Sequence, residues 1–170
     1  MRGARLLAGA GLALAIGFCA SGAWTYGQAR TDDAPAYGRQ RDRALAEGRA
    51  GIAVLTTLDA SSRQRAEAGI RAWRDASTGP LRDALGRTEP KTGASARGTV
   101  TEAAVTALDT RAGTAKLIAT VSVEVTPAGT KRPTTDRKRL EAVLARTDAG
   151  EWKVRALNAV PLAGYGKDDR

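Results

Sequence analysis

The chain has 170 residues and a mass of 17.7 kDa, with 27 Lys and Arg against 18 Asp and Glu, no His and one Cys. This length suits one ordinary domain with a short appendage. The lack of His removes the most common general base and metal ligand, and with it every Ser-His or Cys-His nucleophile pair. A single Cys excludes an internal disulfide framework and a thiolate zinc cluster. These exclusions leave a small anchored or secreted module.

The formal net charge is +9 and the isoelectric point is about 10.4. A strong positive balance is typical of proteins that bind nucleic acid or anionic membranes. Most of the basic residues are Arg, in a chain rich in Ala, Gly and Thr, which is also the residue usage of a GC-rich genome. Both origins of the charge stay open, so the charge alone names no partner.

The N-terminal segment has the pattern of a membrane anchor. Leu6–Ala23 contains no charged residue and follows a short head that carries two Arg residues. A helix of this length rises about 27 Å, close to the hydrocarbon thickness of about 30 Å. Trp24 and Tyr26 follow where aromatic rings prefer the headgroup layer. We therefore predict a cytoplasmic head over 1–5 and a transmembrane anchor over 6–26.

Processing of this segment is the alternative. Cleavage after Ala23 would release a secreted protein, but the apolar run is longer than a usual signal-peptide core. Lipid attachment at Cys19 needs a small residue before it, and Phe18 stands there. The basic head favours a cytoplasmic N-terminus. We expect a single-pass protein of the cell membrane whose C-terminal domain is extracytoplasmic.

Helical periodicity follows a predicted juxtamembrane linker over 27–39. Apolar residues recur at helical spacing over 40–57. Asp59, Ser61 or Ser62 can cap a second helix that continues to about residue 76. Pro80 precedes a short third helix over 81–86, because proline is tolerated in a first helical turn.

The period then changes from helical to alternating, with a kink expected near Ala103. Helices followed by a meander of strands predict an α+β domain, in which two to three helices pack on a curved antiparallel four-stranded sheet. This arrangement resembles the cone-shaped nuclear-transport-factor-2-like (NTF2-like) plan, expected over 40–160 with a flexible tail over 161–170. The predicted strands are 100–108, 115–126, 137–147 and 151–158.

Three short phrases stand out against this background. They are Leu55-Thr56-Thr57-Leu58-Asp59, Leu81-Arg82-Asp83 and Gly150-Glu151-Trp152-Lys153-Val154. An anchor followed by these phrases resembles the Mce-associated membrane proteins of actinobacteria, with a likeness that covers about residues 43–160. The resemblance implies an NTF2-like exported domain and a non-enzymatic accessory role beside Mce systems, which move lipids or sterols across the envelope. The chain departs from the family in its few aromatic residues and its basic stretch at 131–139.

Some proteins of the cone-shaped plan are enzymes with an acid or base inside the cone. A catalytic base needs a raised pKa and hence burial, whereas Glu124 shares the polar side of its strand with Thr120 and Ser122. We expect the acidic residues to lie on the surface or in cross-strand ion pairs, and we expect no enzyme, catalytic residue, cofactor or metal site. The candidates considered are Asp59, Glu102, Glu124 and Glu141.

One basic cluster is a candidate binding surface. It would contact anionic lipid headgroups or an acidic partner, or it would serve only as a solvated edge that discourages strand pairing. No Tyr or Phe is interleaved with the cluster to stack a base, so we expect no nucleic acid partner. Its residues are Lys131, Arg132, Arg137, Lys138 and Arg139.

Ile70, Trp73 and Trp152 are the apolar candidates. They fall on the inward stripe of the second helix and on the inward face of the last strand. We expect them to anchor the core, because large aromatic side chains bury much apolar area. The alternative is that they contact an apolar ligand.

These observations predict a non-enzymatic membrane accessory protein that binds or stabilises other envelope proteins, in an Mce-type lipid or sterol import complex. Two alternatives stay open. The cone itself would hold a lipid or another apolar ligand. The chain would otherwise be a scaffold of a type IV secretion or conjugation-like machine, because some assembly proteins of those machines share the anchor-plus-cone layout.

Overall fold

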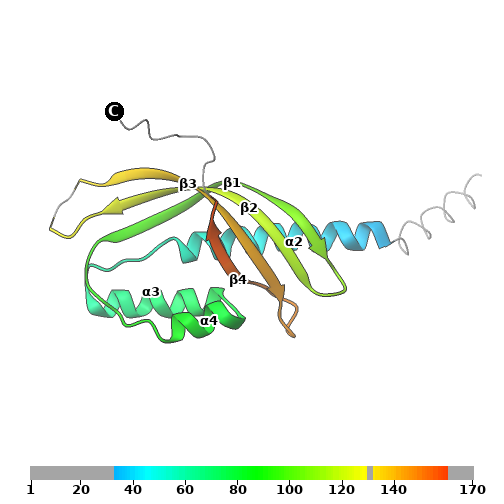
Figure 1. Ribbon diagram of the computed structural model, residues 1–170, viewed down its shortest axis with the longest axis horizontal. Helices are drawn as coiled ribbons and strands as arrows, with labels where there is room; N and C mark the ends of the chain where they lie inside the picture. Colours follow the sequence, from blue (N-terminus) through cyan, green and yellow to red (C-terminus); the bar gives the residue numbers. More distant parts are fainter. Residues whose placement is uncertain (1–32, 130–131, 161–170) are drawn as a thin grey trace, which may run out of the picture. The chain divides into compact units, whose positions relative to one another are not determined.

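The computed structural model describes residues 33–129 and 132–160 (Figure 1). The predicted head over 1–5, anchor over 6–26 and tail over 161–170 lie outside the described residues. Within the described ranges, every helix is too short or too polar to cross a membrane.

Three helices precede four strands, as the alternation of periods predicted. The four strands form one sheet in chain order, and every neighbouring pair is antiparallel. The predicted α+β class is confirmed. The elements are α2 (Asp33–Leu55), α3 (Arg63–Ala76), α4 (Gly79–Gly86), β1 (Ser95–Asp109), β2 (Thr114–Thr126), β3 (Thr134–Arg146) and β4 (Trp152–Ala159).

Helix α2 begins at Asp33, so the second half of the segment expected as a linker is helical. The sequence allows this start, because an acidic residue near a helix N-terminus complements the helix dipole. Pro35 then falls in the first turn, where a missing N–H costs no hydrogen bond. The prediction of a start near residue 40 was wrong because it followed only the apolar positions.

The ends of the next two helices follow local chemistry. The Ser62 side chain accepts a hydrogen bond from the Arg65 backbone N–H at 3.3 Å, so Ser62 is the N-cap of α3 among the three candidates. Pro80 lies in the first turn of α4, as expected. Ser77 follows α3 and is buried; its hydroxyl donates to the Trp73 carbonyl at 2.8 Å.

The strand alternation places one row of side chains in the core. On β2, five alternate residues from Ala115 to Val123 are buried. Strand β1 has register shifts between Val100 and Glu102 and between Val105 and Ala107, on either side of the predicted kink. Bulges of this kind bend a strand. Strand β3 begins three residues earlier than predicted. The prediction missed this start because the first six residues of the strand are exposed and show no alternation of apolar and polar residues.

Helix α2 packs very closely on one face of the sheet. A Cβ atom added at Gly48 would stand 2.5 Å from Leu117 Cδ2 and 2.8 Å from Leu144 Cδ1. One added at Gly51 would stand 2.9 Å from Val154 Cγ2. Since these three side chains are fully buried, the space between this part of α2 and the sheet is filled by protein.

Backbone hydrogen bonds join the helical part to the sheet. Leu58 and Ala96 exchange two N–H to carbonyl bonds of 2.8 Å, and the Thr78 N–H donates to the Val154 carbonyl at 2.9 Å. A Glu47 Oε2 atom accepts the Trp152 N–H at 2.5 Å. Figure 1 shows the helices on one face of the sheet. No described helix covers the opposite face, which we call the outer face.

We predict that Gly48→Leu lowers the free energy of unfolding by about 1–3 kcal/mol, the usual cost of overpacking a filled core. Gly38→Leu is the matched control, since no described atom outside its own helix lies within 4 Å of a Cβ at that position. Urea unfolding of the full chain, followed by tryptophan fluorescence, measures both. Equal stability of the two variants would show that the close helix–sheet contact is wrong.

Candidate functional site

The register of β3 decides which basic side chains share a face. Leu140, Ala142 and Leu144 are buried on the core side. Successive residues of a strand point to opposite faces, so Arg137 and Arg139 point to the outer face. The predicted basic cluster is therefore not a single surface, because successive side chains of β3 point to opposite faces of the sheet.

The outer face is hollowed around these two arginines. Arg139 pairs in register with Thr120, and Thr120 with Glu102, so the three residues form a row across β3, β2 and β1. Arg137 is the next outward residue on β3. The hollow has a volume of about 560 Å³ and is closed at one side by Ala159 and Val160, where the described part of β4 ends. We call it the basic hollow.

The two guanidinium groups in the basic hollow are unpaired. Within residues 33–129 and 132–160, neither Arg137 nor Arg139 has an ion pair or a side-chain hydrogen bond. Lys138 also lines the basic hollow. Strand alternation directs its side chain to the other face, where its Nζ lies 3.6 Å from Asp136 Oδ2. Each unpaired Arg carries five N–H donors in a planar fork that matches a carboxylate or phosphate.

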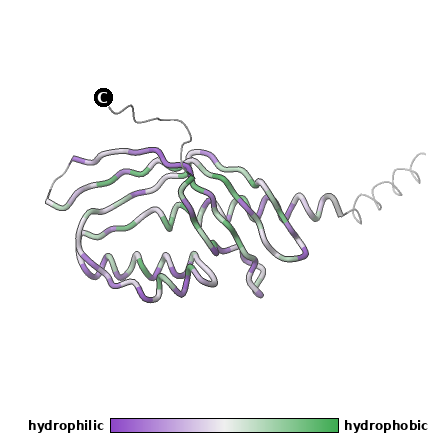
Figure 2. The backbone as a smooth tube through the Cα atoms, in the orientation of Figure 1, coloured by the Kyte–Doolittle hydropathy of each residue, from purple (hydrophilic) through white to green (hydrophobic). Residues whose placement is uncertain are grey.

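Of the remaining members of the predicted cluster, Arg132 is not among the residues that line the basic hollow. Arg132 is exposed and precedes β3, and Lys131 lies outside the described residues. Arg137–Arg139 belong to β3, as the strand predicted over 137–147 implies. Figure 2 shows the hydrophilic character of the first half of β3 beside the more hydrophobic β2.

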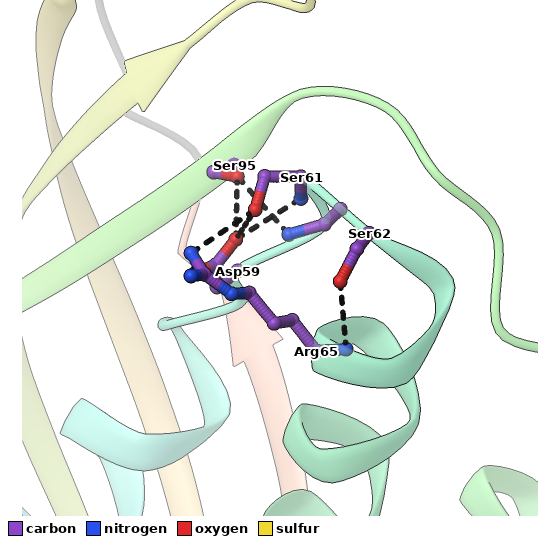
Figure 3. A network of polar contacts seen from close by, with 6 residues as sticks. Asp59, Ser61, Ser62, Arg65 and Ser95 are labelled. Atoms are coloured by element: carbon purple, nitrogen blue, oxygen red, sulfur yellow. Dashed lines mark hydrogen bonds and ion pairs between the residues drawn. The ribbon is translucent and has the colours of Figure 1, made fainter.

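Asp59 belongs to a separate polar network, shown in Figure 3. Its Oδ1 accepts the Ser61 hydroxyl at 2.5 Å, the Ser61 N–H at 3.0 Å and the Ser95 hydroxyl at 3.4 Å. Arg65 Nη1 donates to Oδ2 at 2.9 Å. The hydrogen bonds from Ser61, and then the Arg65 guanidinium, lower the pKa of Asp59 from 3.8 to about 2. A carboxylate stabilised in this way is a weak base, so its role here is to fasten the loop before α3 to the start of β1.

The other acidic candidates are all exposed. Glu102, Glu124 and Glu141 lie on the outer face, and none of them has an ion-pair partner among the described residues. The expected surface position is confirmed, whereas the expected cross-strand ion pairs are absent there. Glu102 alone lines the basic hollow. In the described part of the chain, no three His, Cys, Asp or Glu residues are grouped so as to hold a metal ion.

The apolar candidates have different environments. Trp152 is only 4% exposed and lies in the core with Val154, and Ile70 is 9% exposed on α3. Trp73 is half-buried, and its indole N–H donates to the carbonyls of Val54 at 2.9 Å and Thr57 at 2.8 Å. Trp73 therefore holds the C-terminal end of α2, a role that the apolar stripe did not indicate.

A second hollow, of about 610 Å³, lies between α2 and α3. Its lining is mostly small or apolar, including Val54, Ala68, Gly69 and Ala72. None of the three apolar candidates lines it. The only charged side chains at this hollow, Asp59 and Arg65, are already paired with each other.

No protein-family model matches the sequence, and no curated protein matches it. Among solved structures, the chain is similar to one described as an NTF2-like protein involved in plasmid conjugation. The sequence identity is 11% and the TM-score is 0.49, over 75% of this chain and 52% of that chain. This chain therefore spans about half the length of that structure. The order and packing of the helices and strands described above are themselves consistent with the NTF2-like plan.

We predict that the Asp59 network gives this protein a component of acid sensitivity. Because the pKa is lower in the folded chain, ionised Asp59 stabilises the fold fully above about pH 4, and this stabilisation is lost as the pH falls to about 2. Asp59→Asn is expected to lower stability at neutral pH and to reduce the loss over that interval. Urea unfolding at several pH values measures both effects. Asp83→Asn removes an exposed carboxylate without a described partner and should change neither; identical pH profiles for wild type and Asp59→Asn would contradict the prediction.

Proposed function

We propose that this chain is a non-enzymatic, membrane-anchored docking protein that binds another envelope protein through the basic hollow. The observation that carries the proposal is a pair of guanidinium groups, Arg137 and Arg139, that have no partner among the described residues and lie in an open hollow on the outer face. Charge-assisted hydrogen bonds from Arg to carboxylates are among the stronger polar contacts in proteins. An exposed sheet surface also admits a large partner without any rearrangement of the core.

The proposed topology follows from the N-terminal sequence. The uncharged run over 6–26 would hold the chain in the cell membrane, with the basic head in the cytoplasm and the domain over 40–160 on the extracytoplasmic side. The basic hollow would then face proteins of the envelope. The membrane, other envelope proteins and a lipid are the partners considered, and no nucleic acid is expected.

The resemblance to the Mce-associated membrane proteins supports a lipid or sterol import complex as the assembly that is bound. The phrases that carry this resemblance have structural roles in this chain. Leu55–Asp59 forms the end of α2 and the loop with the Asp59 network, and Trp152 and Val154 are buried after the turn at Gly150. These phrases therefore support a shared architecture. The partner is determined by the residues of the basic hollow, which the phrases do not include.

The packing of α2 argues against an internal lipid site. Gly48 and Gly51 bring the helix backbone against Leu117, Leu144 and Val154, so no volume remains for an acyl chain between them. Trp152 is itself part of this filled core. A protein contact on the outer face needs no such volume, which is why we favour docking over ligand storage.

An enzymatic role is also disfavoured by the acidic residues. The hydrogen bonds and the Arg65 contact that lower the pKa of Asp59 work against a general base. Glu102, Glu124 and Glu141 are solvent-exposed. Replacement of Glu124 and Glu141, which do not line the basic hollow, by glutamine is expected to leave biological activity intact, and loss of activity in a folded variant would favour an enzyme.

The docking proposal predicts site-specific cross-links in cells that produce the full chain. A photo-reactive residue at Ser122, the register partner of Arg137, should form adducts with envelope proteins, and one at exposed Gln64 on α3 should form few. Arg137→Gln combined with Arg139→Gln should reduce the Ser122 adducts about tenfold or more. A hydrogen bond to a charged group contributes about 1.5–3 kcal/mol, and about 1.4 kcal/mol corresponds to tenfold.

The proteins found in the adducts distinguish between the two assemblies considered, a lipid-import complex and a secretion or transfer machine. Mce subunits or permeases in the adducts support the lipid-import complex, whereas components of a secretion or transfer machine would favour that alternative scaffold. Equal adducts from Ser122 and Gln64, or none from Ser122, would contradict docking at the basic hollow.

A further inference from the structure

Within residues 33–129 and 132–160, the first half of β3 has a hydrogen-bonding partner on one side only. Strand β2 pairs with β3 along its length, from Thr114 opposite Ala145 to Val125 opposite Thr134. Strand β4 pairs only with the second half, from Leu140 to Arg146. Among the described residues the last contact on that side is the Val160 N–H, which donates to the Arg139 carbonyl at 2.9 Å. The open edge is therefore Thr134–Lys138, which Figure 1 shows extending with β2 past the end of β4.

The backbone groups that face this edge can be assigned from the last hydrogen bond. In an antiparallel strand, the N–H and C=O of one residue point to the same side, and those of the next residue point to the other side. Because the Arg139 carbonyl points toward β4, the polar backbone groups of Arg137 and Thr135 point to the open edge. Arg137 thus offers a free backbone pair at the edge and a free guanidinium group on the outer face.

We propose that the open edge of β3 binds an extended acidic segment of a partner protein as an added strand. This inference rests on the proposed docking function and specifies its partner. Addition of a strand satisfies the free N–H and C=O groups of Thr135 and Arg137, and side chains two residues apart give the specificity. Acidic residues at alternate positions of the partner would lie beside Arg137 and Arg139 on the outer face.

The charges of the edge select this partner over others. A second copy of the same edge would bring Arg137, Lys138 and Arg139 against identical residues, and like charges directly opposite destabilise strand pairing. An acidic strand reverses the sign of that interaction. On the other face, Lys138 is already paired with Asp136, so the attraction is confined to the face of the basic hollow. The same positive charges thus prevent pairing of the edge with a second copy and attract an acidic partner.

Peptide binding to the purified full chain in neutral detergent tests the proposal. The probe is a short labelled peptide in which Glu alternates with Val, and fluorescence anisotropy measures its affinity. We expect binding that falls about tenfold or more in the variant with Arg137→Gln and Arg139→Gln. Arg87→Gln combined with Arg111→Gln removes two exposed charges elsewhere and should leave affinity unchanged.

Two changes test strand addition without altering charge. Thr135→Pro removes an N–H that faces the open edge and that the β2–β3 ladder does not use, and proline is tolerated at such edge positions. It should weaken binding about threefold to tenfold, whereas Thr135→Val should not. A peptide methylated on its backbone nitrogens should bind more weakly by a similar factor. Circular dichroism confirms that the variants keep their strands.

Several results would overturn the proposal. Unchanged affinity of both Thr135→Pro and the methylated peptide would mean that charge alone attracts the peptide. Binding of vesicles that contain phosphatidylglycerol, lost in the double Arg variant and without any peptide binding, would assign the hollow to lipid headgroups. Peptide binding that appears only after removal of residues 161–170 would make the chain itself the occupant. If Ser122 cross-links persist while the peptide fails to bind, the docking function stands and strand addition alone is wrong.

Discussion

The close contact between α2 and the sheet is the constraint on which the rest of the domain depends. Gly48 and Gly51 carry no side chain, so the helix backbone lies directly over Leu117, Leu144 and Val154. A residue with a Cβ at Gly48 would overlap side chains that are fully buried and that have no free volume to move into. This contact fills the space between this part of α2 and the sheet, which favours the surfaces of the domain as the places where it recognises another molecule.

The outer face follows from this arrangement through the two-residue period of a strand. Once Leu140, Ala142 and Leu144 are directed into the core, Arg137 and Arg139 must point away from it. The shorter β4 then ends beside Arg139. The first half of β3 thus combines positive charge, a shallow hollow and an open backbone edge. Strand alternation causes the first feature, and the end of β4 causes the last. Their coincidence is what makes this region a stronger candidate for recognition than the apolar hollow between α2 and α3, whose charged residues are already paired.

Much of the fold was predictable because its signals are local. The alternation over 115–126 describes a strand with one buried face, and a Ser before a helical stripe describes an N-cap. The first half of β3 was misplaced because its residues are exposed, so the strand leaves no apolar period there. The start of α2 was misplaced because the apolar period begins only near residue 40, after the acidic residue and the proline of the first turn. The role of Trp73 was missed because its hydrogen bonds reach carbonyls on a different helix, and no spacing within one helix encodes such a partner.

The amino-acid sequence by itself determined the α+β class, the order of the elements, the absence of His-based chemistry and the presence of a basic cluster near residues 131–139, because composition and periodicity are properties of neighbouring residues. Only the tertiary structure decided that the space between Gly48, Gly51 and the sheet is filled. It alone also decided that the side chains of two of those arginines and of Lys138 point to opposite faces, and that Asp59 is held ionised by Ser61 and Arg65. These features depend on how far apart two elements pack and on which strand ends first, and both are set by contacts between residues distant in the chain.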